Sequence, residues 1–178
     1  IVIGALVRRA PELTDLELVQ VLTFGKAAYA APELAGHIRI NTLFISDTQR
    51  AAVHEGRGDF TPCFLSEIPL LFKNGNLPLD AALIHVSPPD EHGFCSFGVE
   101  VSVTKTASQS AKHVIAEVNP KMPRTLGDAF IHVSKLDYIV EVDYELPEVN
   151  MAATSDLSVR VASNVAGLIP DGATLQTG

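Results

Sequence analysis

The sequence predicts an α/β domain built on an open, mainly parallel sheet with helices on both faces. Apolar runs of strand length recur along the chain, with helix-like segments between them. Several of these runs are continuously hydrophobic rather than alternating, which is typical of parallel strands covered on both faces by helices. Parallel strands need crossover connections, and the helix-like segments supply them.

Seven segments are expected to form strands. The clearest are residues 79–86 and 113–118, which are almost uninterrupted apolar runs. The remaining five are shorter or more mixed, and they comprise residues 16–24, 38–46, 59–64, 129–134 and 138–142.

Two helices are expected between these strands. Asp47 is a good N-cap for a helix over residues 48–55, and Gly56 and Gly58 would end it. Residues 100–112 form the second candidate. Their Val and Thr content lowers helix propensity, so packing would have to hold this helix.

A third helix is expected from about residue 154 or 155 to 166. Leu157, Val161 and Val165 recur at helical spacing and would share one face. Gly167 near the end and Pro170 beyond it are typical stop signals. The preceding residues 143–150 have the composition of an exposed acidic linker.

The composition describes one acidic globular domain. With 178 residues and 47% hydrophobic residues, the chain can bury a real core. The formal net charge of −8 and scattered basic residues argue against nucleic-acid binding, because a phosphate-binding face needs clustered Lys and Arg. No run approaches the ~20 apolar residues of a membrane span, and no signal peptide is evident. We expect no nucleic-acid partner, no membrane and a cytoplasmic location.

The two cysteines and the two chain ends carry little chemistry of their own. Cys63 and Cys95 give no disulfide framework and no zinc spacing, and burial as small hydrophobes is the simpler interpretation. The chain begins at Ile1 without a methionine and stops at Gly178 in a glycine-bearing turn. We expect both ends to be cut.

An acid-and-histidine turn with two prolines follows the apolar run 81–86. An open α/β sheet places a ligand-facing loop in this position. The turn occupies residues 87–98, and Pro88 and Pro89 follow its first residue, Ser87. In its simplest interpretation Asp90 caps backbone donors and Gly93 adopts a positive φ.

Two catalytic interpretations of the same turn are weaker. Asp90, Glu91 and His92 have the side chains of metal ligands, but three consecutive residues rarely point at one ion, so we predict no metal site. Cys95, His92 and Asp90 would form a hydrolase triad only if the fold brought them together, which the sequence does not show.

Lys121 and Arg124 form the strongest local basic site in an otherwise acidic chain. They lie in a proline-flanked loop after residues 113–118. An anionic carboxylate or phosphate ligand would find a partner there. Solvated surface charges remain the alternative.

The C-terminal residues 173–175 read as a short strand between Gly172 and Gly178. Glycine-rich backbone after a strand can bring amide donors against a phosphate or a thioester oxygen. The chain has no G-x-G-x-x-G and no P-loop lysine, which disfavours nucleotide binding of those kinds.

Several motifs in order give the chain a family resemblance. With the turn 87–98, the loop 117–124 and the ending 170–178, the chain resembles the acetyl-CoA hydrolase and 4-hydroxybutyrate CoA-transferase family of class I CoA-transferases. Further matching stretches comprise residues 22–25, 56–62, 64–69, 130–134 and 137–141.

The resemblance implies an enzyme of two similar α/β domains. Residues 1–178 would be its N-terminal domain, with the C-terminal domain absent and residues 170–178 starting the interdomain glycine loop. The family moves CoA between an acyl-CoA and a carboxylate such as acetate or 4-hydroxybutyrate, through a glutamyl-CoA thioester. The nucleophilic glutamate is expected beyond Gly178, so we assign no catalytic residue in this chain and expect the fragment alone to be inactive.

The resemblance also implies the ligands and their contacts. Acyl-CoA is a substrate, no permanently bound cofactor is expected, and the partners are the chain's own C-terminal domain and further copies in a homo-oligomer. Gly178 matches the first residue of the loop that contacts the CoA thioester, with Gln176 and Thr177 leading into it. The expected contacts on the carboxylate side are Pro88, His92, Gly93, Asn119, Lys121 and Arg124.

Three alternatives stay open. An acetyl-CoA hydrolase of the same family differs only in letting water reach the glutamyl thioester. A catalytically silent module would bind an anion or a partner domain, and it predicts an exposed apolar face where the second domain docks. A sugar-phosphate isomerase rests on fold analogy alone.

Overall fold

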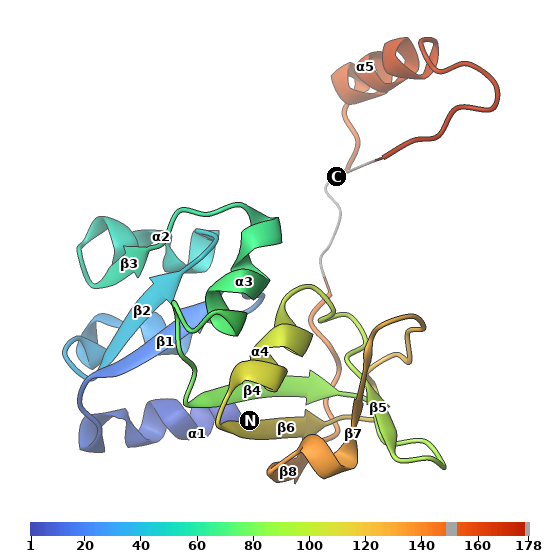
Figure 1. The fold of residues 1–178 in the computed structure, drawn as a ribbon. Coiled ribbons are helices and arrows are strands. Elements are labelled where there is room, and N and C mark those ends of the chain that lie inside the picture. The colour runs from blue at the N-terminus through green and yellow to red at the C-terminus, as the bar shows by residue number, and fades with distance from the viewer. Residues whose placement is uncertain (149–152, 177–178) are drawn as a thin grey trace. The chain divides into compact units, whose positions relative to one another are not determined.

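The computed structural model describes residues 1–148 and 153–176. Contacts within the chain divide it into two units, Ile1–Pro147 and Glu148–Gly178. The first unit holds all the described strands, and α5 is the regular element described in the second (Figure 1). No helix among the described residues has the length and apolarity needed to cross a membrane.

The first unit begins with a helix and a parallel three-stranded sheet in the order β1-β2-β3. Leu16 pairs with Ile38, and Ile40 pairs with Gly58. A buried cluster around Tyr29 supports this sheet. The elements are α1 (Val2–Arg9), β1 (Leu16–Gln20), β2 (Ile38–Thr42), α2 (Asp47–His54) and β3 (Gly58–Phe60).

A second parallel sheet follows in the order β4-β6-β8. Ala81 pairs with His113, and Ile115 pairs with Tyr138. Its core is a buried cluster that includes Val86, which is fully inaccessible to solvent. The elements are α3 (Ile68–Lys73), β4 (Ala81–Val86), α4 (Thr104–Ser110), β6 (His113–Val118) and β8 (Tyr138–Glu141).

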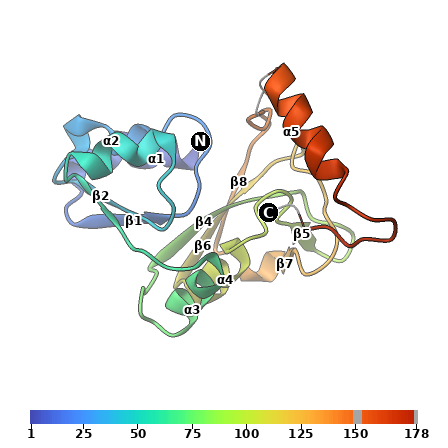
Figure 2. The ribbon, with the colours of Figure 1, turned by 90° about the horizontal axis from the view of Figure 1, so that it is seen from above.

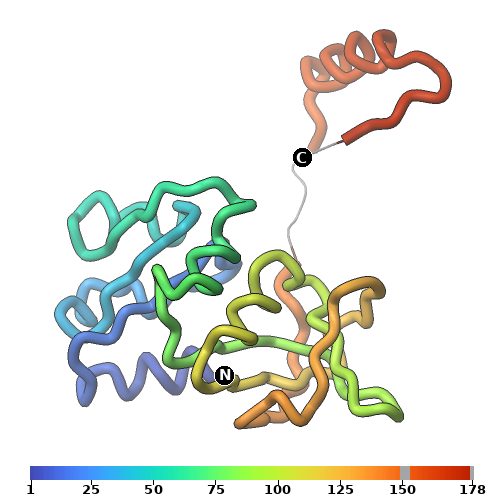
Figure 3. The backbone as a smooth tube through the Cα atoms, viewed as in Figure 1, coloured from blue at the N-terminus to red at the C-terminus, as the bar shows by residue number. Residues whose placement is uncertain are grey.

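Two short strands form a separate antiparallel pair beside the second sheet. Cys95 of β5 (Phe94–Ser96) pairs with Ile131 of β7 (Phe130–His132). The chain completes β1–β3 before it passes through α3 to the second sheet, as Figure 3 shows. Helices α3 and α4 lie side by side (Figure 2). Single 3-10 turns occupy Ala10–Glu12, Ala28–Ala30, Pro32–Leu34, Leu65–Glu67 and Val133–Lys135.

The predicted α/β class with parallel strands is confirmed, and a strand lies at each of the seven expected positions. Residues 113–118 form a strand with the expected bounds, β3 begins one residue early at Gly58, and the other five are shorter than expected. The strands pair in two parallel sheets and one antiparallel pair, a division that hydrophobicity alone does not reveal. The sequence analysis missed α1, α3 and β5. Helix α3 has six residues, too few to show a helical period, and its buried Ile68 and Phe72 hold it by packing.

Three local predictions need correction. Asp47 is the first residue of α2, and Ser46 is its N-cap. Residues 100–112 are helical only from Thr104 to Ser110. Residues 173–175 form no strand, because none of the described residues pairs with them, and the chain turns at Gly172 with a φ of +75°. The third helix is confirmed as α5 (Asp156–Ala166), with Ser155 as N-cap.

Candidate functional site

The loops that follow β4, β6 and β8 meet at the carboxyl edge of the second sheet. Parallel strands end at the same side, so Val86, Val118 and Glu141 bring their loops together. The Arg124 guanidinium forms an ion pair with the Asp90 carboxylate. We call the loops 87–93, 119–124 and 142–145 the second-sheet edge.

Asp90 organises the turn after β4. Its Oδ1 accepts backbone hydrogen bonds from His92 N at 3.0 Å and Phe94 N at 2.8 Å. The bond from Phe94 N is the largest influence on the pKa of Asp90 and lowers it. Burial, the second largest, opposes this, but the bond from His92 N and the Arg124 charge keep the pKa below its usual value. Gly93 has a φ of +81°. The predicted capping turn is therefore confirmed.

Arg124 is held on three sides. Its Nη1 donates to the Phe94 carbonyl oxygen at 2.9 Å, and its guanidinium carbon lies 4.8 Å from the centre of the Phe130 ring. The ion pair with Asp90 completes the set. These contacts fasten the turn to β7, and a substrate carboxylate would have to compete with Asp90 for the guanidinium.

Asn119 and Lys121 connect the loop after β6 to the segment after β8. The buried Asn119 side chain donates from Nδ2 to the Tyr144 carbonyl oxygen at 2.9 Å, and its Oδ1 accepts from Lys121 N at 2.9 Å. Lys121 Nζ lies 3.2 Å from Glu145 Oε1, and this carboxylate raises the pKa of Lys121. Asn119 thus orders the loop, while Lys121 stays exposed.

The other residues that were predicted to contact the ligands belong to two different units of the chain. Pro88 and His92 are exposed on the turn of the second-sheet edge. Gln176 is exposed in the second unit, outside any helix or strand. Thr177 and Gly178 lie outside the described residues. Five of the six residues predicted to contact the carboxylate form hydrogen bonds within or beside the second-sheet edge. They are His92, Gly93, Asn119, Lys121 and Arg124.

The triad interpretation of the turn has no geometric support. Cys95 is fully buried on β5, and burial raises the pKa of its thiol, whereas a nucleophilic cysteine needs a lowered one. His92 is exposed on the turn. Across residues 1–148 and 153–176, no three His, Cys, Asp or Glu side chains gather closely enough to hold a metal ion.

The carboxyl edge of the first sheet carries a polar chain that the sequence analysis missed. Gln20 Nε2 donates to Thr42 Oγ1 at 2.9 Å, and Thr23 Oγ1 donates to Gln20 Oε1 at 2.6 Å. Tyr29 OH donates to Thr23 Oγ1 at 3.0 Å, and Gln49 Nε2 donates to Tyr29 OH at 3.1 Å. We call these five residues the first-sheet edge.

Each of the three strands of the first sheet ends at, or is closely followed by, an exposed phenylalanine. Phe24, Phe44 and Phe60 lie at or just after the ends of β1, β2 and β3, and they are 59%, 57% and 45% exposed. Exposed aromatic side chains beside convergent polar groups are typical of ligand sites. A phenylalanine within each of the first three predicted strands was the signal that could have identified this edge.

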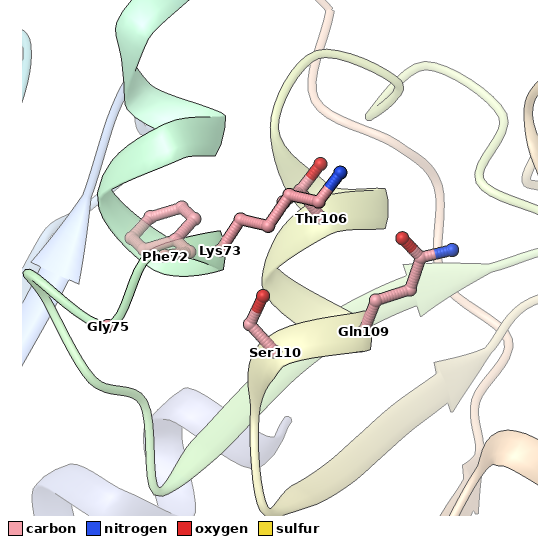
Figure 4. A pocket seen from close by; sticks show the side chains of 6 residues that line it. All are labelled: Phe72, Lys73, Gly75, Thr106, Gln109 and Ser110. Atoms are coloured by element: carbon pink, nitrogen blue, oxygen red, sulfur yellow. The ribbon is translucent and has the colours of Figure 1, made fainter.

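A cavity of about 380 Å³ lies between α3 and α4 (Figure 4). The Lys73 side chain extends from α3 toward Thr106 of α4. The cavity is near the carboxyl ends of both helices, where free carbonyl groups disfavour an anion. We therefore do not assign it to a carboxylate or to CoA. Its lining comprises Phe72, Lys73, Gly75, Thr106, Gln109 and Ser110.

Comparisons with known proteins place this domain. Residues 1–149 match the model of the acetyl-CoA hydrolase/transferase N-terminal domain. The chain is 50% identical over 176 residues to the 4-hydroxybutyrate coenzyme A transferase of Clostridium kluyveri, covering 99% of this chain and 41% of that protein. It is 44% identical to a succinyl-CoA:acetate/propanoyl-CoA:succinate CoA transferase of Fasciola hepatica, covering 93% of this chain and 34% of that protein.

Solved structures of CoA-transferase relatives have the same fold as this chain. A 4-hydroxybutyrate CoA-transferase from Porphyromonas gingivalis matches with a TM-score of 0.80 and 39% identity, over 98% of this chain and 40% of that one. RipA from Yersinia pestis matches with a TM-score of 0.90 and 30% identity, over 99% and 43%. The fold and these relatives define a domain of the CoA-transferase class. The chain belongs to the acetyl-CoA hydrolase/transferase family, and it spans about two fifths of the length of these relatives.

Proposed function

We propose that this chain is part of an acyl-CoA:carboxylate CoA-transferase. The observation that carries the proposal is the 50% identity, across 99% of the chain, to a 4-hydroxybutyrate coenzyme A transferase. The substrates are an acyl-CoA and a small carboxylate, with 4-hydroxybutyrate or acetate as the first candidates. CoA enters and leaves as a substrate, and the proposal includes no permanently bound cofactor.

The chemistry requires a glutamate from a further domain of the same protein. Its carboxylate attacks the thioester carbonyl carbon, the carbon–sulfur bond breaks, and CoA leaves as a thiolate from an acyl-glutamyl anhydride. The thiolate then attacks the glutamyl carbonyl carbon, which releases the first carboxylate and leaves a glutamyl-CoA thioester. The incoming carboxylate reverses both steps. This chain binds and orients the reactants.

Two groups of residues are proposed to contact the substrates at the second-sheet edge. Pro88, His92 and Gly93 come from the turn after β4, and Asn119, Lys121 and Arg124 follow β6. Their support is that the loops meet at the carboxyl edge of a parallel sheet, where α/β proteins bind ligands. Gln176, Thr177 and Gly178 are proposed to lead to the thioester.

The first-sheet edge is proposed to receive the acyl chain. Phe24, Phe44 and Phe60 offer apolar surface for the hydrocarbon part, and the partly exposed Thr23 hydroxyl oxygen offers an acceptor for an ω-hydroxyl. A cytoplasmic location and a homo-oligomer complete the proposal for the whole protein.

A hydrolase is the second candidate, because the matching family model covers both hydrolases and transferases. The two activities differ in the acceptor that attacks the glutamyl thioester. Release of free CoA in the absence of a carboxylate acceptor favours the hydrolase, and CoA transfer to 4-hydroxybutyrate or acetate favours the transferase.

The test uses a chimera in which residues 1–178 replace the matching stretch of the Clostridium kluyveri relative. We expect the chimera to transfer CoA from acetyl-CoA to 4-hydroxybutyrate and the 178-residue chain alone to be inactive. A folded chimera, with a cooperative thermal transition, that neither transfers CoA nor hydrolyses acetyl-CoA would contradict the proposal and favour a silent binding module. Activity of the 178-residue chain alone would contradict the proposed position of the glutamate.

Arg124 provides a sharper test of the second-sheet edge. Arg124→Lys keeps the charge but loses the forked donor geometry. If Arg124 contacts the carboxylate, KM for the carboxylate rises about tenfold in the chimera, a loss of about 1.4 kcal/mol of binding. Lys112→Arg, at an exposed lysine beside the opposite, amino-terminal edge of the second sheet, is the control. A lowered Tm with an unchanged KM would mean that Arg124 only fastens the turn.

A further inference from the structure

Helix α5 carries an apolar face that the described residues of its own unit leave uncovered. Leu157, Val161 and Val165 recur at every fourth position, and they are 68%, 53% and 53% exposed. Together with Ile169 they line a shallow groove of about 550 Å³. Ser163 lies on the opposite side of the helix, where its hydroxyl donates to the Val159 carbonyl oxygen.

A helix of this length requires packing against a partner. Isolated helices shorter than about 12–15 residues are marginal in water, and α5 has 11 residues. Its N-cap is well formed, because the Ser155 hydroxyl accepts from Ser158 N at 3.1 Å. Capping satisfies a backbone group but buries no apolar surface, so the stability of α5 has to come from a surface that covers Leu157, Val161 and Val165.

Two boundaries separate α5 from the first unit. Contacts within the chain divide after Pro147. The model of the family's N-terminal domain ends at residue 149, before α5 begins at Asp156. The relatives are more than twice as long as this chain, so they contain protein that could cover the helix.

We propose that the Leu157–Val161–Val165 face of α5 docks on the further domain of the same protein, so that α5 is the first helix of that domain rather than the last of this one. The inference rests on the proposed function in one respect, namely that a further domain exists. The inference assigns an interface to α5. It also places a domain boundary between Pro147 and Asp156, in place of the single domain over residues 1–178 that the sequence led us to expect.

The test measures amide hydrogen exchange of α5 in the 178-residue chain and in the chimera defined above. In the 178-residue chain we expect the α5 amides to exchange within about tenfold of an unstructured peptide. In the chimera we expect them to be protected about 100-fold or more. Val161→Glu should remove that protection, and Ser163→Glu, which adds the same side chain to the opposite face, should leave it unchanged.

Three results would overturn the inference. Protection of α5 in the monomeric 178-residue chain, lost with Val161→Glu, would mean that the first unit covers the face. Protection that rises with protein concentration, together with a dimer in sedimentation, would mean that a second copy covers it. Unprotected α5 in a folded chimera would mean that the face stays open.

The exchange readout is independent of catalysis. A chimera without CoA transfer but with a protected α5 would contradict the proposed function and leave the interface standing. An active chimera with an unprotected α5 would contradict the interface alone. If Val161→Glu prevents folding of the chimera, the comparison of the unsubstituted chimera with the 178-residue chain still decides the question.

Discussion

Arg124 and Asp90 form an ion pair across 34 residues of sequence, and this pair joins the loop after β6 to the turn after β4. The same guanidinium bonds the Phe94 carbonyl oxygen at 2.9 Å, so the pair also fixes the start of β5. The ion pair thus fastens together two loops that the parallel strands already bring to one edge.

Asp90→Asn should change how the stability depends on pH. The pKa of Asp90 is lowered in the folded chain, so its carboxylate contributes stability above the unfolded value near 3.9, and this contribution is lost as the pH falls through the lowered pKa. We expect the Tm of the variant to be lower at pH 7 and to fall less between pH 5 and pH 3. Thermal unfolding checks this, with the exposed neighbour substitution Glu91→Gln as control. Parallel Tm curves for Asp90→Asn and the unsubstituted chain would contradict the role of Asp90.

Alanine in place of Gly98 should destabilise the chain strongly. Gly98 has a φ of +60°, and an added Cβ would contact Met122 Sδ and lie 2.9 Å from the Pro123 carbonyl oxygen. Gly127, with a φ of +95°, has no atom within 4 Å of an added Cβ. We expect Gly127→Ala to cost about 1 kcal/mol from backbone strain and Gly98→Ala about 3 kcal/mol or more, because strain and overlap combine. Urea unfolding measures both, and equal losses would show that the overlap is relieved.

His85 should make the stability fall as the pH decreases from 7 to 5. Burial lowers the pKa of His85, partly opposed by the nearby Glu117 carboxylate and reinforced by the amino-terminal charge, so the folded chain holds the ring neutral. The unfolded chain takes up the proton near pH 6.5, which favours unfolding below that pH. Within the described residues Nε2 of His85 has no hydrogen-bond partner, and the ring packs 5.4 Å from that of Tyr144.

His85→Phe is therefore expected to flatten the Tm between pH 7 and pH 5. The substitution removes both the titrating group and the unpartnered nitrogen, and it keeps an aromatic ring beside Tyr144. His54→Phe, on the exposed side of α2, should leave the pH dependence unchanged. The prediction fails if the slope of Tm against pH is the same with and without His85.

Thr42→Val should weaken the first-sheet edge. The Thr42 hydroxyl is fully buried, donates to the Phe44 carbonyl oxygen at 2.6 Å and accepts from Gln20 Nε2. Valine has the same shape but leaves both partners unsatisfied, which we expect to cost about 1–3 kcal/mol in denaturant unfolding. Thr14→Val, at an exposed loop position, should change stability by less than about 0.5 kcal/mol. Equal effects at the two positions would show that the polar chain contributes nothing.

The sequence predicts several local features of the candidate site well. Asp90 and Gly93 form the expected turn because the capping oxygen and the positive φ involve residues within four positions of each other. The loops 87–98 and 119–124 meet because parallel strands end at one edge of the sheet, while their contact with a substrate stays a prediction. The first-sheet edge was not predicted. Its chain of side-chain hydrogen bonds, which runs from Thr42 to Gln49, depends on how β1, β2 and α2 pack.

The sequence by itself determined the α/β class, the approximate positions of the strands, helix α5 and the capping turn, because hydrophobic period, helix caps and glycine φ values act over a few residues. Only the tertiary structure decided that the strands form two parallel sheets, that Arg124 is held by Asp90 and Phe130, and that Asn119 is hydrogen-bonded to the Tyr144 carbonyl oxygen. The contacts of Arg124 with Asp90 and of Asn119 with Tyr144 join residues 34 and 25 positions apart. Several packings satisfy the same local preferences until the core selects one.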